Sequence, residues 1–198
     1  MFRLRLRRLL ARLLVRAIQS PRVFVFRLLS DNRVHGNPVR FQPVQFTGSG
    51  KIIFEDKVTI GYFPSPMFFS TYAYFDARNS TSEISIGANT VINNNFSIIA
   101  ESSQIKIGRR CLIGANVEII DSDFHGVKVS ERNISDPSRS VPVNIGDDVF
   151  IGSNVKIMKG VTIGRGAVIA NGAIVVNNVP ENVVAGGAAA KVLKPIEP

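Results

Sequence analysis

The chain contains few residues of the kinds that build disulfides, metal centres and membrane spans. Its 198 residues include one cysteine, Cys111, so no disulfide can form within a chain, and this composition fits a reducing compartment. The two histidines, His35 and His125, are too few for the three-histidine zinc site of a γ-class carbonic anhydrase. No uninterrupted apolar run approaches the ~20 residues of a transmembrane helix.

Acidic residues are missing from the first thirty positions, so the net positive charge of the chain is concentrated in its N-terminal segment. The formal net charge is +9. Residues 1–40 hold ten arginines against Asp31 alone, whereas the rest of the chain holds 14 basic and 14 acidic side chains. A neutral main body has no general attraction for polyanions, so we expect no nucleic-acid partner. The length suits one domain with an appendage.

Residues 1–20 combine a leucine-rich stripe with arginines on another side. The apolar residues recur at i, i+3 and i+4 spacing, which predicts a basic amphipathic helix. Ser20 and Pro21 are expected to end this helix, and residues 22–29 add a second short apolar stretch. Charges and apolar residues are interleaved, whereas a secretory signal would separate them.

Three interpretations of this N-terminal segment remain open. Residues 1–30 could lie on an anionic membrane surface, where arginines near the surface are attracted to acidic lipids. The leucine side could instead pack on the body of the protein or on a neighbouring subunit. Arginine enrichment without acidic residues also fits a mitochondrial-type targeting sequence. The first two interpretations are compatible with each other.

A six-residue repeat dominates the second half of the chain. An aliphatic residue recurs every six positions from residue 145, as Ile145, Ile151, Ile157, Ile163, Ile169 and Val175. Upstream hexads follow the same rule, with a phase shift between Ile98 and Ile107. A helix of 3.6 residues per turn cannot keep this period on one face, and an amphipathic strand alternates with period two. The repeat therefore predicts a solenoid in which three hexads complete one triangular coil.

The hexads "IGANTV", "IGRRCL", "IGDDVF" and "IGSNVK" make residues 84–194 resemble the hexapeptide-repeat acyltransferase family. The resemblance implies a left-handed parallel β-helix. The organisation expected from it has four parts. These are a helical extension (1–40), a cap with irregular first coils (41–83), the β-helix (84–187) and a C-terminal tail (188–198). Residues 121–142 do not follow the repeat and are expected to leave the β-helix as a loop.

The resemblance also implies a chemistry. Members of the family are typically homotrimers that transfer an acetyl group from acetyl-coenzyme A to a hydroxyl or amine, without a metal, in clefts between subunits. "DSDFHG" at 121–126, followed by "VNIGDDVFIGSN", is similar to the sugar O-acetyltransferase branch, and it identifies His125 as the general base. Asp123 or Asp121 could orient the imidazole ring. A backbone carbonyl could do so instead.

Further residues match positions that the family uses to bind its substrates. Asn93 and Asn95 match acceptor-binding asparagines, although each could equally be a turn asparagine. For coenzyme A, the matching residues are Phe150, Ser153, Asn171, Gly172 and Lys191. The chain departs from the family pattern near the nucleotide end, at Val176 and Asn177 and again at Ala188 and Ala189. Cys111 falls in phase with apolar positions and is expected to be a small core residue.

The predicted function is that of an acetyl-coenzyme A-dependent O-acetyltransferase acting on a sugar hydroxyl. The acceptor is expected to be a bacterial surface polysaccharide or its lipid-linked precursor, modified in the cytoplasm at the inner face of the membrane. Two alternatives remain. One is N-acetylation of an amino sugar, and the other is a non-catalytic β-helix that serves as a scaffold or binding module. Residues 1–83 show no βαβ or glycine-rich pattern, which argues against a Rossmann-like N-terminal half.

Overall fold

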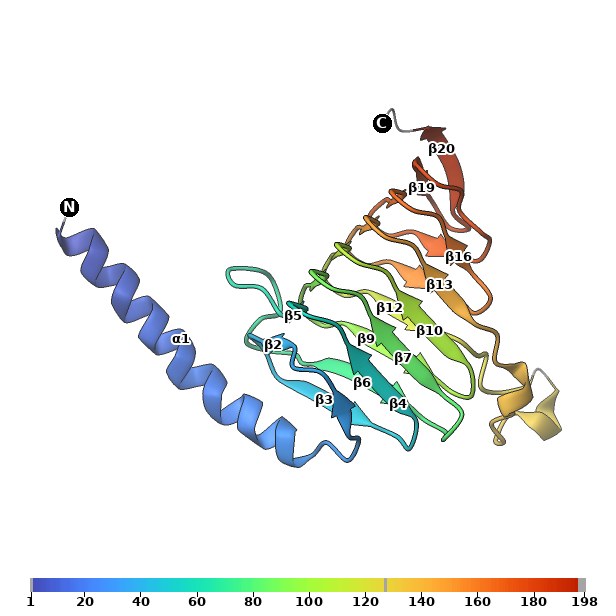
Figure 1. The fold of residues 1–198 in the computed structure, drawn as a ribbon, viewed down its shortest axis with the longest axis horizontal. Helices are drawn as coiled ribbons and strands as arrows, with labels where there is room; N and C mark the ends of the chain where they lie inside the picture. The colour runs from blue at the N-terminus through green and yellow to red at the C-terminus, as the bar shows by residue number, and fades with distance from the viewer. Residues whose placement is uncertain (1, 127, 196–198) are drawn as a thin grey trace.

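Three sheets of parallel strands form the faces of a triangular β-helix in the computed structural model, which describes residues 2–126 and 128–195 (Figure 1). Sheet A contains β1 (Val34–His35), β4 (Lys51–Phe54), β7 (Glu83–Ile86), β10 (Gln104–Ile107), β13 (Val143–Ile145) and β16 (Thr162–Ile163). Sheet B contains β2 (Val39–Arg40), β5 (Thr59–Ile60), β8 (Val91–Ile92), β11 (Leu112–Ile113), β14 (Phe150–Ile151), β17 (Val168–Ile169), β19 (Val183–Gly186) and β20 (Lys191–Pro195). Sheet C contains β3 (Val44–Thr47), β6 (Ala73–Ala77), β9 (Ser97–Ala100), β12 (Glu118–Ile120), β15 (Lys156–Ile157) and β18 (Ile174–Val175).

The chain visits the sheets in the order A, B, C, and each circuit is one coil. We name the turns after the sheets that they connect, as corner AB, corner BC and corner CA. The inward residue of each strand stacks on its equivalent in the next coil, as Ile113 does on Ile151 and Ile151 on Ile169. All three side chains are fully buried. Each contributes on the order of 2–3 kcal/mol, so the repeat predicts the β-helix because it supplies these columns.

The glycine that follows many leading aliphatics is required by the spacing between coils. A Cβ atom on Gly108 would lie 2.5 Å from the backbone carbonyl carbon of Gly146 in the next coil. No side chain fits at that separation. The glycine is therefore part of the stacking.

The β-helix begins at Val34, inside the expected helical extension (1–40), and the first coils expected within residues 41–83 are continuous with the later ones. Residues 34–77 already supply strands to all three sheets, and β1 pairs in parallel with β4. Phenylalanine rings fill these first coils, with centroids of Phe46 and Phe75, and of Phe54 and Phe75, each 5.4 Å apart. Phenylalanine replaces isoleucine in the first coils of sheet C, whereas Ile52 and Ile60 keep the columns of sheets A and B. The hexapeptide pattern is therefore only partial in these coils.

Helix α1 runs from Phe2 to Leu28, so the expectation that Ser20 and Pro21 end it is wrong. Proline removes one backbone hydrogen bond and strains the turn before it. Contacts beyond this point offset that cost. Arg22 donates a hydrogen bond of 2.9 Å to the Thr71 carbonyl, and the Phe26 and Tyr72 rings lie 4.6 Å apart. Both partners belong to residues 62–72, which we call the aromatic segment and which form a long turn at corner BC.

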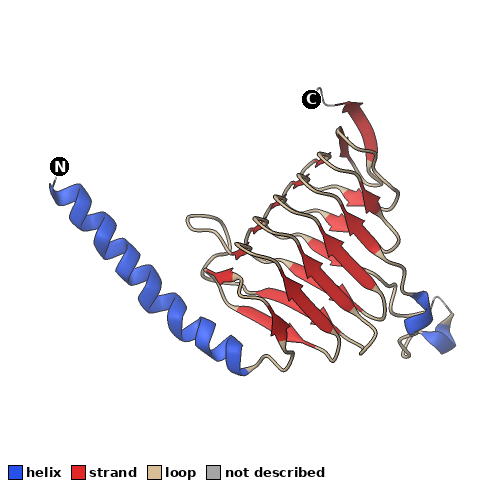
Figure 2. Ribbon diagram, viewed as in Figure 1, coloured by secondary structure: helices blue, strands red, loops and turns tan. Residues whose placement is uncertain are grey.

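The C-terminal strand β20 closes the other end of the molecule. It pairs antiparallel with β19, in contrast to the parallel pairing inside the β-helix. Figure 2 shows this strand beside the last coil. It covers residues 191–195 of the expected C-terminal tail (188–198), and residues 196–198 of that tail lie outside the described residues.

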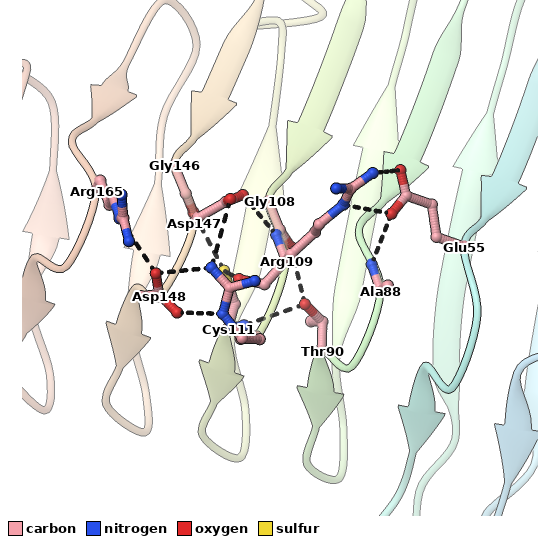
Figure 3. A network of polar contacts seen from close by, with 11 residues as sticks. Glu55, Ala88, Thr90, Gly108, Arg109, Cys111, Gly146, Asp147, Asp148 and Arg165 are labelled. Carbon is pink, nitrogen blue, oxygen red and sulfur yellow. Dashed lines mark hydrogen bonds and ion pairs between the residues drawn. The ribbon is translucent and has the colours of Figure 1, made fainter.

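Ion pairs connect coils along corner AB, either neighbouring coils or, for Arg109 and Glu55, coils on either side of the β7 coil (Figure 3). Arg109 pairs with Glu55 at 2.8 Å, and Asp148 pairs with Arg110 at 2.6 Å and with Arg165 at 3.2 Å. Hydrogen bonds from these arginines hold the pKa of Glu55 and of Asp148 below their ordinary values. The groups are exposed and satisfied by one another, which fits a role in coil stacking.

No helix among the described residues is long and apolar enough to cross a membrane.

Candidate active site

The loop at 121–142 leaves the β-helix at corner CA, between β12 and β13, as expected from the sequence. Two short 3-10 helices lie within it, η1 (Val129–Glu131) and η2 (Pro137–Arg139). His125 forms a bridge with Ser135 across the loop and is exposed. Neither imidazole nitrogen of His125 has a hydrogen-bond partner among the described residues. The ring is therefore free to exchange a proton with a bound molecule.

A buried carboxylate anchors this loop from the coil below. Glu101 follows β9 at corner CA and is fully buried. Its two carboxylate oxygens accept short hydrogen bonds from the hydroxyls of Ser122 and Ser135. These serines lie near the start of the loop and beside His125, so Glu101 fastens both sides of the segment that carries the histidine.

A lysine anchors the loop from the coil above. Lys159 lies at corner CA after β15, and its ammonium group is 2.5 Å from a carboxylate oxygen of Asp123. The same group donates to the carbonyl of Arg139 at 3.2 Å. The loop is thus held between two stacked turns of the β-helix.

Neither candidate aspartate contacts the imidazole of His125. The carboxylate of Asp121 is buried and accepts hydrogen bonds from the backbone N–H groups of Glu101 at 2.7 Å and Ser103 at 2.9 Å. Burial nevertheless raises the pKa of Asp121 above its ordinary value. Asp123 is paired with Lys159, and its backbone carbonyl accepts from the His125 N–H at 2.6 Å. Both aspartates hold the backbone around the histidine and leave its ring without a carboxylate partner.

The asparagines expected to bind an acceptor lie at corner BC. Asn93 is half-buried and accepts a hydrogen bond from the next backbone N–H at 2.8 Å. Asn95 has a positive φ and donates to Asn116 at 2.7 Å, which in turn donates to Asn154 at 2.9 Å. Asn95, Asn116 and Asn154 thus form a row of hydrogen-bonded side chains in three stacked turns. In this row Asn95 is a turn residue that links one coil to the next.

Three of the residues expected to bind coenzyme A adjoin one another at corner BC. The Ser153 N–H donates to the Asn171 side-chain oxygen at 2.8 Å, and the Gly172 N–H donates to the Ser153 carbonyl at 2.9 Å. Phe150 lies beside them on the outer side of β14 and is exposed. Lys191 lies on β20, where it pairs with Gly186 at the end of sheet B.

The candidate residues therefore form two groups within one chain. His125 lies at corner CA, whereas the asparagine, serine and glycine candidates lie at corner BC. Sheet C separates the two corners, so a single chain does not bring the groups together. No group of three His, Cys, Asp or Glu side chains that could hold a metal occurs in the described part of the chain.

Sequence reasoning did not identify Glu101 or Lys159 as supports of the loop. Both are brought to it by coil stacking, which joins residues 20 or more positions apart. A signal was present, because the hexad phase shifts between Ile98 and Ile107 and Glu101 falls inside that shift. An acidic residue at this place interrupts an otherwise apolar and small-residue pattern.

Comparisons with known proteins agree with this architecture. Residues 142–177 match the model of the bacterial transferase hexapeptide family, described as six repeats, and residues 104–132 match the hexapeptide repeat of succinyl-transferase. The chain is a hexapeptide-repeat protein. Its fold is the left-handed parallel β-helix that the family resemblance implied.

This hexapeptide-repeat protein is similar to several acetyltransferases. It is 37% identical, over 138 residues, to a Saccharomyces cerevisiae protein named provisionally as an acetyltransferase. That match covers 70% of the chain and 65% of the yeast protein, so the chain spans less than two thirds of this relative. A hexapeptide-repeat acetyltransferase of Vibrio cholerae, solved with acetyl-coenzyme A, is 26% identical with a TM-score of 0.54, covering 90% of this chain and 78% of that one. A polySia-specific acetyltransferase is 26% identical with a TM-score of 0.55, covering 81% and 67%.

Proposed function

We propose that the protein transfers an acetyl group from acetyl-coenzyme A to a hydroxyl group of a sugar in a bacterial surface polysaccharide or its lipid-linked precursor. The observation that carries this proposal is the exposed imidazole of His125, without a hydrogen-bond partner among the described residues, on a loop fixed between two coils. The similarity to acetyltransferases, one of them specific for polySia and one solved with acetyl-coenzyme A, supports the donor and the sugar acceptor. Because acetyl-coenzyme A is a cytoplasmic metabolite, the proposal places the reaction in the cytoplasm.

His125 is the general base in this proposal. Its neutral imidazole takes the proton from the sugar hydroxyl as the oxygen forms its new bond, and the resulting imidazolium returns that proton to the departing sulfur. Glu101 and Lys159 hold the loop, so the ring keeps its place while its charge changes. No covalent bond to the protein forms at any stage. Bound acetyl-coenzyme A supplies an acetyl group activated as a thioester.

Corner BC offers a surface on which the donor can lie. Gly172 has a φ of +73°, and a Cβ atom there would meet nothing within 4 Å, so the space beside its backbone is open. Ser153 and Asn171 flank this opening, and Phe150 adds an exposed apolar ring. These residues would hold the extended pantetheine arm, and Lys191 would hold a phosphate of the nucleotide. Asn93 would contact the acceptor.

A second copy of the chain would complete the site. The outward column of sheet B is largely apolar, with Val91, Leu112, Phe150 and Val168 in register. The corresponding column of sheet C includes Ser97, Glu118 and Lys156. An exposed apolar stripe along sheet B favours contact with another subunit. In a homotrimer in which sheet B of one chain packs beside corner CA of the next, corner BC of the first chain would lie close to His125 of the second.

Acetyl transfer can be tested by incubating the protein with acetyl-coenzyme A and a panel of nucleotide sugars, lipid-linked glycans and polysaccharides. Release of the coenzyme A thiol reports turnover, and lability of the product to hydroxylamine separates an ester from an amide. We expect ester formation on a sugar hydroxyl. The His125→Ala variant should lose about 10²- to 10⁴-fold in rate while keeping its fold.

His35 provides a matched control, because it is the other histidine and lies exposed on β1, remote from the loop at 121–142. His35→Ala should turn over like the unmodified protein. Wild-type rates in His125→Ala would refute the general-base role. An amide product would identify an amino sugar as the acceptor, and absence of turnover with every acceptor would favour a non-catalytic β-helix.

A further inference from the structure

Helix α1 turns its leucine-rich side away from the β-helix. Its contacts with the body come from Gln19, Arg22 and Phe26, and the Gln19 amide donates to the Phe68 carbonyl at 2.6 Å. Leu10 lies nine residues before Gln19, which at about 100° per residue places it on the opposite side of the helix. The side chains of Leu10 and Leu14 are 56% and 63% exposed. The interpretation that the leucine side packs on the chain's own body is therefore wrong.

A basic cavity of about 670 Å³ lies between α1 and the aromatic segment. Four arginines line it, three from the helix and one from β2. They are Arg12, Arg16, Arg27 and Arg40. Aromatic side chains, among them Phe24 and Phe63, line much of the rest, together with two valines and two uncharged polar residues, and no acidic residue lines it. The cavity thus combines several positive charges with apolar walls.

The positive charge in this cavity has no counter-charge among the residues that line it. None of the four arginines forms an ion pair with any described residue. Burial and the nearby charge of Arg27 lower the pKa of Arg40. Guanidinium groups gathered without a carboxylate favour an anion, and their geometry suits a phosphate.

The apolar surface around the cavity favours a phosphate carried by a lipid over a free ion. Phe41, Tyr62, Phe63 and Phe69 of the body are exposed near the helix. Figure 1 shows α1 extending from this end of the β-helix, with its N-terminal half standing clear of the sheets. Apolar residues beside a row of arginines, with no acidic residue in positions 1–30, are typical of helices that lie in a membrane interface.

We propose that this cavity binds the phosphate of an acidic phospholipid at a bilayer surface, while Leu9 and Leu13, on the side of α1 next to the cavity-lining Arg27, enter the same leaflet. The body contributes Arg40 and its aromatic side chains, so the folded protein provides a site that the helix alone lacks. The inference does not depend on the proposed acetyl transfer, because it concerns other residues and a different measurement. It makes the first thirty residues a docking element whose orientation is set by the β-helix.

Vesicle partitioning of the full chain tests this proposal. We expect sedimentation with vesicles of phosphatidylglycerol and phosphatidylcholine, and little with phosphatidylcholine alone. The Arg16→Gln and Arg40→Gln variants should each lower the partition coefficient by about fivefold, and the double variant by about thirtyfold. Leu13→Gln should weaken partitioning as well, because Leu13 is exposed on the leucine-rich side.

Lys51→Gln combined with Lys106→Gln is the matched control. It removes the same charge from the outer face of sheet A, away from the helix, and should change partitioning by no more than about twofold. The proposal is wrong if the protein binds neutral and acidic vesicles equally. It is also wrong if Arg40→Gln, confirmed as folded, partitions as the unmodified chain does, since the helix would then bind alone. A Leu13→Gln variant that changes only the oligomeric state would assign the leucine-rich side to a second copy.

Discussion

Replacement of Glu101 should release the loop that carries His125 while leaving the β-helix folded. The carboxylate accepts two hydrogen bonds, from Ser122 and Ser135, and both serines belong to the loop. A hydrogen bond to a charged group contributes about 1.5–3 kcal/mol, and one between neutral groups about 0.5–1.5 kcal/mol. In Glu101→Gln the amide can keep both contacts in neutral form, so the loop should lose about 2–3 kcal/mol of docking free energy.

Because the loop at 121–142 is held less tightly in Glu101→Gln, a larger fraction of the molecules has this loop detached from the β-helix. A change of about 2 kcal/mol raises that population roughly thirtyfold. Trypsin provides the assay, because Lys128 lies in the loop with its side chain largely exposed. When opening is fast compared with cleavage, the cleavage rate follows the open population. We expect Glu101→Gln to be cut in the loop about thirty times faster at nearly unchanged Tm, with a parallel fall in any acetyl transfer.

Glu118→Gln is the control for the loss of one negative charge. Glu118 lies on the outer face of sheet C and is paired with Lys156 at 3.4 Å, away from the loop. This variant should be cleaved at the unmodified rate. Equal cleavage of Glu101→Gln and the unmodified protein, or equal acceleration in both variants, would contradict the anchoring role of Glu101.

Other perturbations test the stacking and the buried thiol. Gly108→Ala should destabilise the fold by about 1–3 kcal/mol or more, seen as a lower Tm, because its Cβ would press on the backbone of Gly146; an unchanged Tm would contradict this spacing. Burial raises the pKa of Cys111, so a thiol reagent should modify the unfolded protein fully and the native protein hardly at all. Arg110 holds the pKa of Asp148 low, so this pair stabilises the fold above the ordinary carboxyl pKa and the effect is lost on acidification. Urea titrations near pH 7 and pH 3 should show a smaller pH dependence for Asp148→Asn than for the unmodified chain.

The isoleucine hexads allowed the β-helix to be predicted from sequence because each coil repeats the same packing. The first coils could be expected only as irregular ones within residues 41–83, since Phe46, Phe54 and Phe75 interrupt the hexapeptide pattern there. The end of α1 was misplaced because contacts of Arg22 and Phe26 with the aromatic segment, far along the chain, outweigh the local effect of proline.

In the candidate site, too, the sequence predicts local features but not the contacts that depend on coil stacking. The break in the repeat located the loop and its histidine, because both are local features. The supports of the loop depend on which turns stack above and below it, and that register is set by all the preceding coils. For the same reason, the sequence left open whether Asp121 faces the histidine, and the structure places its carboxylate against the turn at 101–103.

The two ends of the β-helix have a consequence for association of the protein. A stack of parallel coils exposes unpaired backbone groups at each end, which could accept another chain and extend into a fibre. At one end, antiparallel β20 covers sheet B. At the other, the backbone N–H of Asp31, just after α1, donates to the Phe46 carbonyl on the edge strand of sheet C at 3.1 Å. Removing the first 32 residues would expose that edge strand and favour end-to-end polymerisation. A truncated chain would therefore change its association as well as lose α1, whereas a single substitution in α1 leaves the edge covered.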